Sequence, residues 1–126
     1  MLLNQMHHVA IIVSDYEKAK EFYVEKLGFP ILRENFREDR GDWKLDLRFG
    51  DSELEIFAIP NAPARLSAPE AQGLRHLAFR VDDIQASVLQ LKALGIECEP
   101  IRWDTYSQRQ FTFFHDPDGL PLELHE

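Results

Sequence analysis

The chain has 126 residues, a formal net charge of −8 and a single cysteine, Cys98. This length suits one compact domain and is short for two ordinary domains. The acidic balance, with no cluster of lysines and arginines, argues against nucleic acid or an anionic membrane surface as a partner. One cysteine excludes a disulfide within the chain, and neither a signal-like leader nor a long apolar run is evident. We therefore expect a cytoplasmic protein.

The first half of the chain begins with a strand-like pattern, a helix-like pattern and then three more strand-like segments. Residues 7 to 13 alternate as a strand, and Ser14 is expected to cap a helix, with Glu17 completing a capping box and Gly28 ending it. The strand-like segments that follow lie at about 29 to 36, 43 to 49 and 53 to 59. The predicted order is βαβββ.

The second half repeats this order after a linker rich in proline and alanine, residues 60 to 73. A strand is predicted near 75 to 81, a helix near 84 to 94, and further strands near 96 to 102, 109 to 115 and 120 to 125. The sequence thus predicts one α+β domain built of two βαβββ modules, at about 7 to 59 and 75 to 125.

The two halves also match letter by letter. HVAIIVSD, which begins at His8, aligns with HLAFRVDD, which begins at His76, at a shift of 68 residues. SELEIF around Glu55 aligns with LPLELH around Glu123 at the same shift. Each half therefore carries one histidine and one glutamate, 47 residues apart.

Alternation along the strands predicts which way these four residues point. Val13 and its bulky neighbours at alternate positions form the face that packs under the helix, which turns His8 to the opposite face. The same reasoning turns Glu55, His76 and Glu123 away from the helices. Two imidazoles and two carboxylates on one face form a ligand set suited to a divalent metal ion. The alternative is that these four residues lie on the solvent-exposed face of an antiparallel sheet and bind nothing.

From His7 to the C-terminus the sequence resembles the vicinal oxygen chelate (VOC) superfamily, which includes glyoxalase I, bleomycin resistance proteins and ring-cleaving dioxygenases. The segments that carry the resemblance are HHVAIIVSD, EFYVEKLGF, ELEIF, GLRHLAFRVDD and FFHDPDGLPLEL. Within the superfamily the chain is similar to small bacterial glyoxalase-like proteins of unassigned substrate. The resemblance implies cupped mixed sheets with helices on the outer face, and a homodimer.

The resemblance also implies a metal site. Residues that match the metal ligands of the isomerase branch are His8, Glu55, His76 and Glu123. The implied ion is Ni, Co, Mn or Zn rather than Fe. In this branch the metal stabilises an enediolate formed when a proton leaves the carbon next to a carbonyl, and a carboxylate beside the metal carries that proton. Glu123 and Glu55 are the candidate catalytic bases.

Charged and aromatic residues on the same faces are candidates for holding an anionic substrate, although such residues on strands are often simply solvated. These candidates are Lys44, Arg48, Phe57, Arg80 and Arg109. The bacterial glyoxalases that the chain resembles hold glutathione with an arginine four residues after the first histidine and an asparagine five residues after the first glutamate. Here Ile12 and Pro60 stand at those positions, which argues against glutathione dependence.

We therefore expect a metal-dependent lyase or isomerase that acts on a small metabolite with two adjacent oxygens, either an anion or a thiol adduct. Two alternatives remain at this stage. One is a protein that binds and sequesters a metabolite or drug, and the other is a ring-cleaving dioxygenase. A fourth protein ligand argues against the dioxygenase, because oxygen and substrate both need open positions on the iron.

Overall fold

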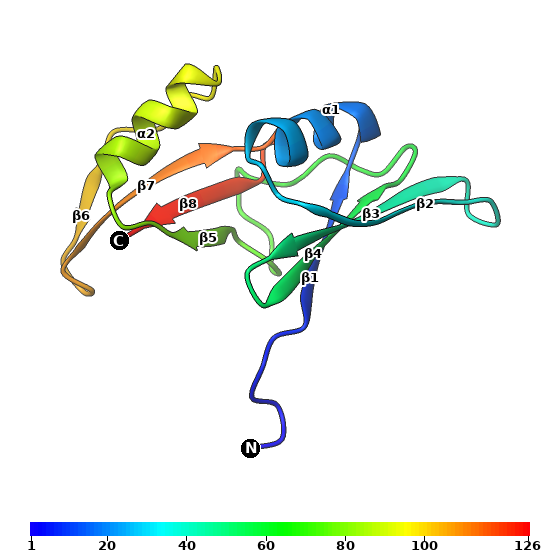
Figure 1. The fold of residues 1–126 in the computed structure, drawn as a ribbon, viewed down its shortest axis with the longest axis horizontal. Helices are drawn as coiled ribbons and strands as arrows, with labels where there is room; N and C mark the ends of the chain where they lie inside the picture. Colours follow the sequence, from blue (N-terminus) through cyan, green and yellow to red (C-terminus); the bar gives the residue numbers. More distant parts are fainter. The chain divides into compact units, whose positions relative to one another are not determined.

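The structure is a computed structural model that describes residues 1–126 and divides into two compact units, residues 1–64 and 65–126. Each unit contains a four-stranded mixed sheet, and the two sheets have the same strand topology (Figure 1). The chain therefore has the two βαβββ modules and the α+β class that the sequence predicts.

The first unit has a sheet with the strand order β1-β4-β3-β2. The two neighbours β1 and β4 are parallel, whereas β4–β3 and β3–β2 are antiparallel. Its elements are β1 (His8–Val13), α1 (Tyr16–Lys20), η1 (Glu21–Lys26), β2 (Ile31–Arg37), β3 (Asp42–Phe49) and β4 (Ser52–Ala58).

The helical segment of the first unit differs from the prediction at its start and in its middle. Asp15, not Ser14, caps it: the Asp15 carboxylate accepts a hydrogen bond from the backbone N–H of Lys18 at 3.0 Å. After Lys20 the α-helix widens into the π-helix η1, in which Leu27 N–H donates to the Phe22 carbonyl at 2.9 Å. The predicted capping box is therefore wrong, although the segment still closes at Gly28.

One face of the first sheet forms the core of this unit. Ile11 and Val13 of β1 are buried, while His8, Ala10 and Ile12, which point to the opposite face, are exposed. The other fully buried residues of this core include Leu45, Leu47, Ile56 and Tyr23. Burying one such aliphatic side chain contributes about 2 kcal/mol, so this face fixes the register of the strands. The opposite face is left for polar groups.

The second unit repeats the arrangement with the strand order β5-β8-β7-β6. Here β5 and β8 are parallel, and the other pairs are antiparallel. Its elements are β5 (Leu77–Arg80), α2 (Ile84–Ala93), β6 (Arg102–Asp104), β7 (Arg109–His115) and β8 (Pro121–His125). Asp83 caps α2 through the backbone N–H of Ala86, as Asp15 does for α1.

The prediction of a strand at 96 to 102 is wrong, because β6 begins only at Arg102. Pro100 has no N–H to give to a sheet ladder, so the preceding residues join β7 by isolated bonds. Glu99 N–H donates to the Phe113 carbonyl at 2.8 Å, and the Thr112 hydroxyl donates to the Glu99 carbonyl at 2.6 Å. The core of this unit is built from Ile84, Phe114, Leu122 and Leu124. Neither unit has a helix with the length and apolar character needed to cross a membrane.

Candidate metal centre

The first unit places one histidine beside one glutamate on the face opposite its core. In the parallel pair β1–β4, Ala10 lies opposite Glu55, and His8 lies two residues earlier on the same face of β1. The Nε2 atom of His8 is 3.6 Å from Oε1 of Glu55. The histidine side chain is 42% exposed and the glutamate side chain 14% exposed, so the pair is open to solvent from the histidine side.

The second unit contains a histidine–glutamate pair, His76 and Glu123, at the positions that the repeat relates to His8 and Glu55. Ala78 lies opposite Glu123 in the parallel pair β5–β8, and Nε2 of His76 is 3.0 Å from Oε2 of Glu123. The His76 ring also packs edge-on against Phe113, with ring centroids 5.1 Å apart. The repeat in the sequence is thus a repeat of side-chain geometry.

Each pair has the donor spacing that a divalent ion needs. Two ligand atoms that each bind one ion at about 2.1 Å lie roughly 3 Å from each other. The separation of 3.0 Å between His76 and Glu123 agrees with that value, and the separation of 3.6 Å between His8 and Glu55 is longer. An imidazole nitrogen and a carboxylate oxygen also suit first-row divalent metals. Each unit therefore fits half of a four-ligand site, and no group of three or more potential ligands gathers at one point.

A network of charges centred on the buried Asp46 lies beside the pair of the first unit. Asp46 lies opposite Glu55 in β3–β4, is only 1% exposed and accepts hydrogen bonds from Lys44 at 2.8 and 3.0 Å and from Arg33 at 2.9 Å. Burial opposes ionisation of Asp46, but the bonds from Lys44 and Arg33 outweigh it and hold the pKa of this carboxyl below its usual value. The Lys44 ammonium is thereby held 3.7 Å from Oε2 of Glu55.

The second unit has aromatic rings where the first has these charges. Phe113 lies opposite Glu123, and Phe111 lies opposite His125. In the first unit the corresponding partners are Asp46 opposite Glu55 and Lys44 opposite Phe57. Arg102 lies over both rings of the second unit, at 5.1 Å from the centroid of Phe111 and 5.6 Å from that of Phe113. The two pairs are equivalent in backbone position and differ in their surroundings.

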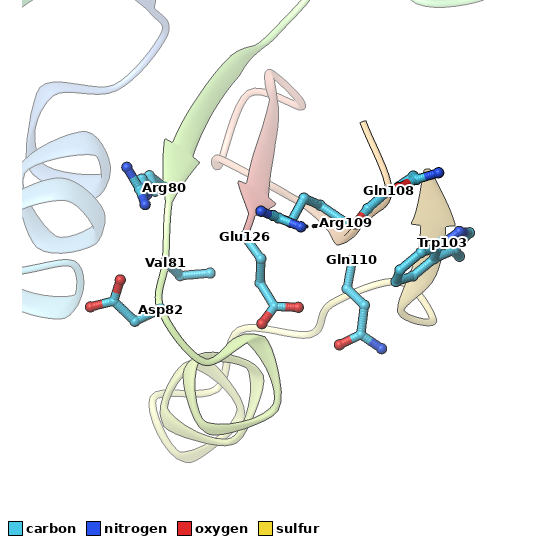
Figure 2. Close-up of a pocket in the computed structure, with 8 residues that line it drawn as sticks. All are labelled: Arg80, Val81, Asp82, Trp103, Gln108, Arg109, Gln110 and Glu126. Carbon is cyan, nitrogen blue, oxygen red and sulfur yellow. Dashed lines mark hydrogen bonds between the residues drawn. The ribbon is translucent and has the colours of Figure 1, made fainter. Parts of the chain in front are cut away.

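The residues predicted to hold substrate have different surroundings. Lys44 is bound to Asp46, and the Phe57 ring is covered by Arg37 at 4.8 Å and by Lys44 at 5.7 Å. Arg48 is an exposed residue opposite Glu53. Arg80 and Arg109 line a hollow of the second unit together (Figure 2).

Sequence reasoning missed two features of these surroundings. Alternation places Asp46 on the glutamate face, but it does not reveal that the side chain is buried and triply hydrogen-bonded. It also missed Trp103 and Gln110, which line the hollow with the two arginines: Trp103 lies in β6, which begins later than predicted, and Gln110 lies in β7, whose predicted bounds are correct.

The fold and the paired sites define a class of small α+β protein with a duplicated module. A family profile described as "Glyoxalase/Bleomycin resistance protein/Dioxygenase superfamily" matches residues 5–124. The chain belongs to this superfamily.

Relatives cover the whole chain at high identity. "Uncharacterized protein YwkD" of Bacillus subtilis is 55% identical over 100% of this chain and 99% of its own length. The crystal structure of a glyoxalase family protein from Enterococcus faecalis is 56% identical, covers 100% of both chains and superimposes with a TM-score of 0.96. The fold is therefore shared with a solved protein chain of the same size.

Other relatives are named for chemical activities. A 2-epi-5-epi-valiolone epimerase of Actinomyces is 32% identical over 94% of this chain and 77% of its own length. A probable lactoylglutathione lyase of Vibrio cholerae is 30% identical over 93% of this chain and 86% of its own length. The superfamily thus includes epimerases and lyases among the relatives of this chain.

Proposed function

We propose that the protein is a metal-dependent lyase or isomerase that acts on a small metabolite with two adjacent oxygens. His8, Glu55, His76 and Glu123 together bind one divalent ion, Ni, Co, Mn or Zn. The observation that carries this proposal is the repeated pair, a histidine Nε2 facing a glutamate oxygen at the same rung of both modules. The four ligands come from one chain or from two chains of a homodimer.

The proposed chemistry is the movement of a proton between neighbouring carbons of the substrate. A divalent ion at the site supplies Lewis acidity, which stabilises negative charge on a substrate oxygen. The carboxylate of Glu123 takes the proton from the carbon next to a carbonyl and returns it to the adjacent carbon. Glu55 is the second candidate base, but the Lys44 ammonium 3.7 Å from its Oε2 favours a fixed position for this carboxylate. We therefore assign proton transfer to Glu123.

The surroundings of the two pairs support different roles for the other predicted residues. Lys44, held by Asp46, orients Glu55, and the Phe57 ring beside it forms a wall of the substrate site. The role of Arg48 as a substrate contact stays a prediction. Arg48 is exposed and lies two residues beyond Asp46 on β3, outside this network. We place the protein in the cytoplasm as a homodimer that acts on a small molecule, in keeping with its family and with its negative charge.

Proton exchange with solvent tests this proposal most directly. Protein purified without chelator is stripped, reloaded in turn with Ni, Co, Mn or Zn, and mixed in D₂O with α-hydroxy ketones and with methylglyoxal plus several thiols. We expect NMR to show metal-dependent deuterium at the carbon next to the carbonyl for at least one compound. Glu123→Gln should abolish the exchange, and the exposed control Asp51→Asn should not.

Two other results would contradict the proposal and establish a different function. Tight binding of a drug such as bleomycin by metal-free protein, without exchange of any compound, would establish sequestration. Oxygen consumption with a catechol and Fe(II), in place of exchange, would establish ring-cleaving dioxygenase chemistry.

A further inference from the structure

A hollow in the second unit lies on the same sheet face as the pair His76–Glu123. It has a volume of about 430 Å³, and its lining includes Ala78, Arg80, Arg109, His125 and Glu126. We call it the arginine pocket. A neighbouring hollow of about 420 Å³ shares Arg80, Arg109 and Glu126 with this pocket, and its other lining residues include Asp82, Trp103 and Gln110 (Figure 2).

The two arginines of this pocket have no carboxylate partner, a property they share with Arg40, Arg48 and Arg65. Arg33, Arg37, Arg75 and Arg102 each form an ion pair with a carboxylate. Arg80 and Arg109 are exposed and form no such pair, although Glu126 and Asp82 lie among the lining residues. The single side-chain bond of Arg109 is from Nη1 to the Gln108 carbonyl at 3.2 Å. Both guanidinium groups therefore keep donors with which to bind an oxyanion.

The pocket begins two residues along the strands β5 and β8 from the rung that carries Glu123, one of the proposed metal ligands. Ala78 is opposite Glu123, and Arg80 is opposite His125. Two residues along a strand span about 7 Å, so Arg80 starts roughly that far beyond the Glu123 rung on the same face. A molecule that reaches both places must carry its oxyanion several bonds away from its reacting centre.

The first unit carries no such cation pair at the positions related by the repeat. The counterpart of Arg80 is Ile12, opposite Phe57, and the counterpart of Arg109 is Asp42, four residues before Asp46. Asp42 is bound by Arg37 through two bonds of 2.6 Å. Two arginines at this position are therefore a feature of the second unit alone, and the shared module architecture does not require them.

We propose that Arg80 and Arg109 bind a terminal carboxylate or phosphate of the substrate, while its two adjacent oxygens lie at the His76–Glu123 pair. This inference rests on the proposed function for the location of the reacting centre. It defines the substrate class as a metabolite with an oxyanion separated by a short chain from its vicinal oxygens. Compounds as small as methylglyoxal would leave the arginine pocket empty.

A matched pair of metal-chelating probes tests the inference without requiring turnover. Adipic monohydroxamate and hexanohydroxamate have the same chain length and the same chelating group, and they differ only in a terminal carboxylate. Calorimetry with metal-loaded protein should show about tenfold tighter binding of the carboxylate, as expected for charge-assisted hydrogen bonds at a partly exposed site. Arg80→Gln/Arg109→Gln should remove this preference. Arg40→Gln, which removes an exposed arginine from a turn of the first unit, should retain it.

A second titration uses metal-free protein, so that failure of the metal site can be told apart from failure of the pocket. The chain has two tryptophans, and Trp43→Phe leaves Trp103, which lines the neighbouring hollow, as the single reporter. Inorganic phosphate and succinate are titrated separately, and the anion that changes Trp103 fluorescence identifies the preferred group. The change should disappear in Arg80→Gln/Arg109→Gln and persist in Arg40→Gln.

The outcomes separate the two proposals. Equal binding of the two hydroxamates, or a preference that survives the double substitution, would overturn the arginine pocket and leave the metal site standing. If neither hydroxamate binds in a metal-dependent way, the proposed function is wrong. The fluorescence titration then decides the anion pocket by itself: no response to either anion overturns it, and a response that needs both arginines supports it.

Discussion

Replacing Asp46, a buried carboxylate on the sheet face opposite the apolar core, by asparagine should destabilise the protein strongly. The Asp46 carboxylate is 1% exposed and accepts hydrogen bonds of 2.8 and 3.0 Å from Lys44 and 2.9 Å from Arg33. Asparagine keeps the shape but loses the negative charge, so the Lys44 ammonium loses its nearest counter-ion and keeps only the longer contact of 3.7 Å to Glu55, while Arg33 keeps Glu53. Breaking a buried charged pair costs about 3–5 kcal/mol, and the half-exposed Arg33 lowers the expectation to about 3 kcal/mol. For a domain of this size that is about 10 °C in melting temperature.

Urea unfolding of Asp46→Asn at several pH values measures this effect. The pKa of Asp46 is lowered in the folded protein, so its contribution is fully present above the ordinary carboxyl pKa of about 4 and is lost as the pH falls toward the folded value. The stability difference from the unsubstituted protein should therefore shrink below about pH 4. Asp51→Asn, which removes the same charge at an exposed turn, is the control. A loss below about 0.5 kcal/mol at neutral pH, or a difference that is constant with pH, would refute the reasoning.

Three further predictions concern the core, a helix end and the thiol. Leu122→Ala removes a fully buried side chain and should lower the free energy of unfolding, measured with urea, by about 3 kcal/mol. A loss below about 1 kcal/mol would mean that neighbouring side chains fill the cavity. Gly28→Ala should lower the free energy of unfolding by about 1 kcal/mol, because Gly28 has a φ of 80°, which strains a residue with a Cβ even though no atom lies close to it there. An unchanged melting temperature would contradict this. Burial, and then the charge of Glu97, raises the pKa of the Cys98 thiol, so its reaction with a disulfide reagent at pH 8 should be slower than that of glutathione; an equal rate would show an accessible thiol.

The repeat allowed much of the fold to be predicted from the sequence. Period-two alternation assigned the correct face to the buried residues of β1, because only one face of the sheet is packed. The helix cap was missed although the repeat contained the answer. Asp15 and Asp83 are equivalent positions and both cap a helix, whereas Ser14 has no equivalent serine.

The features that could not be predicted depend on contacts between segments. A pattern of apolar residues does not distinguish α from π hydrogen bonding, so the widening at η1 was not visible. Likewise, alternation gives the face of Asp46 but not the lysine and arginine that neutralise it. The arginine pocket combines β5, β7 and the end of β8, and the hollow beside it includes Trp103 of β6, which begins later than predicted.

The amount of bound metal per chain tests the central claim most directly. Protein purified without chelator and reloaded with the preferred ion is analysed by mass spectrometry, together with His8→Ala, Glu55→Gln, His76→Ala and Glu123→Gln. We expect one ion per chain in the unsubstituted protein and a clear loss in each of the four variants. His115→Ala, which removes an exposed histidine of β7, should keep the full amount. Unchanged metal content in His8→Ala and Glu123→Gln would contradict the proposed site.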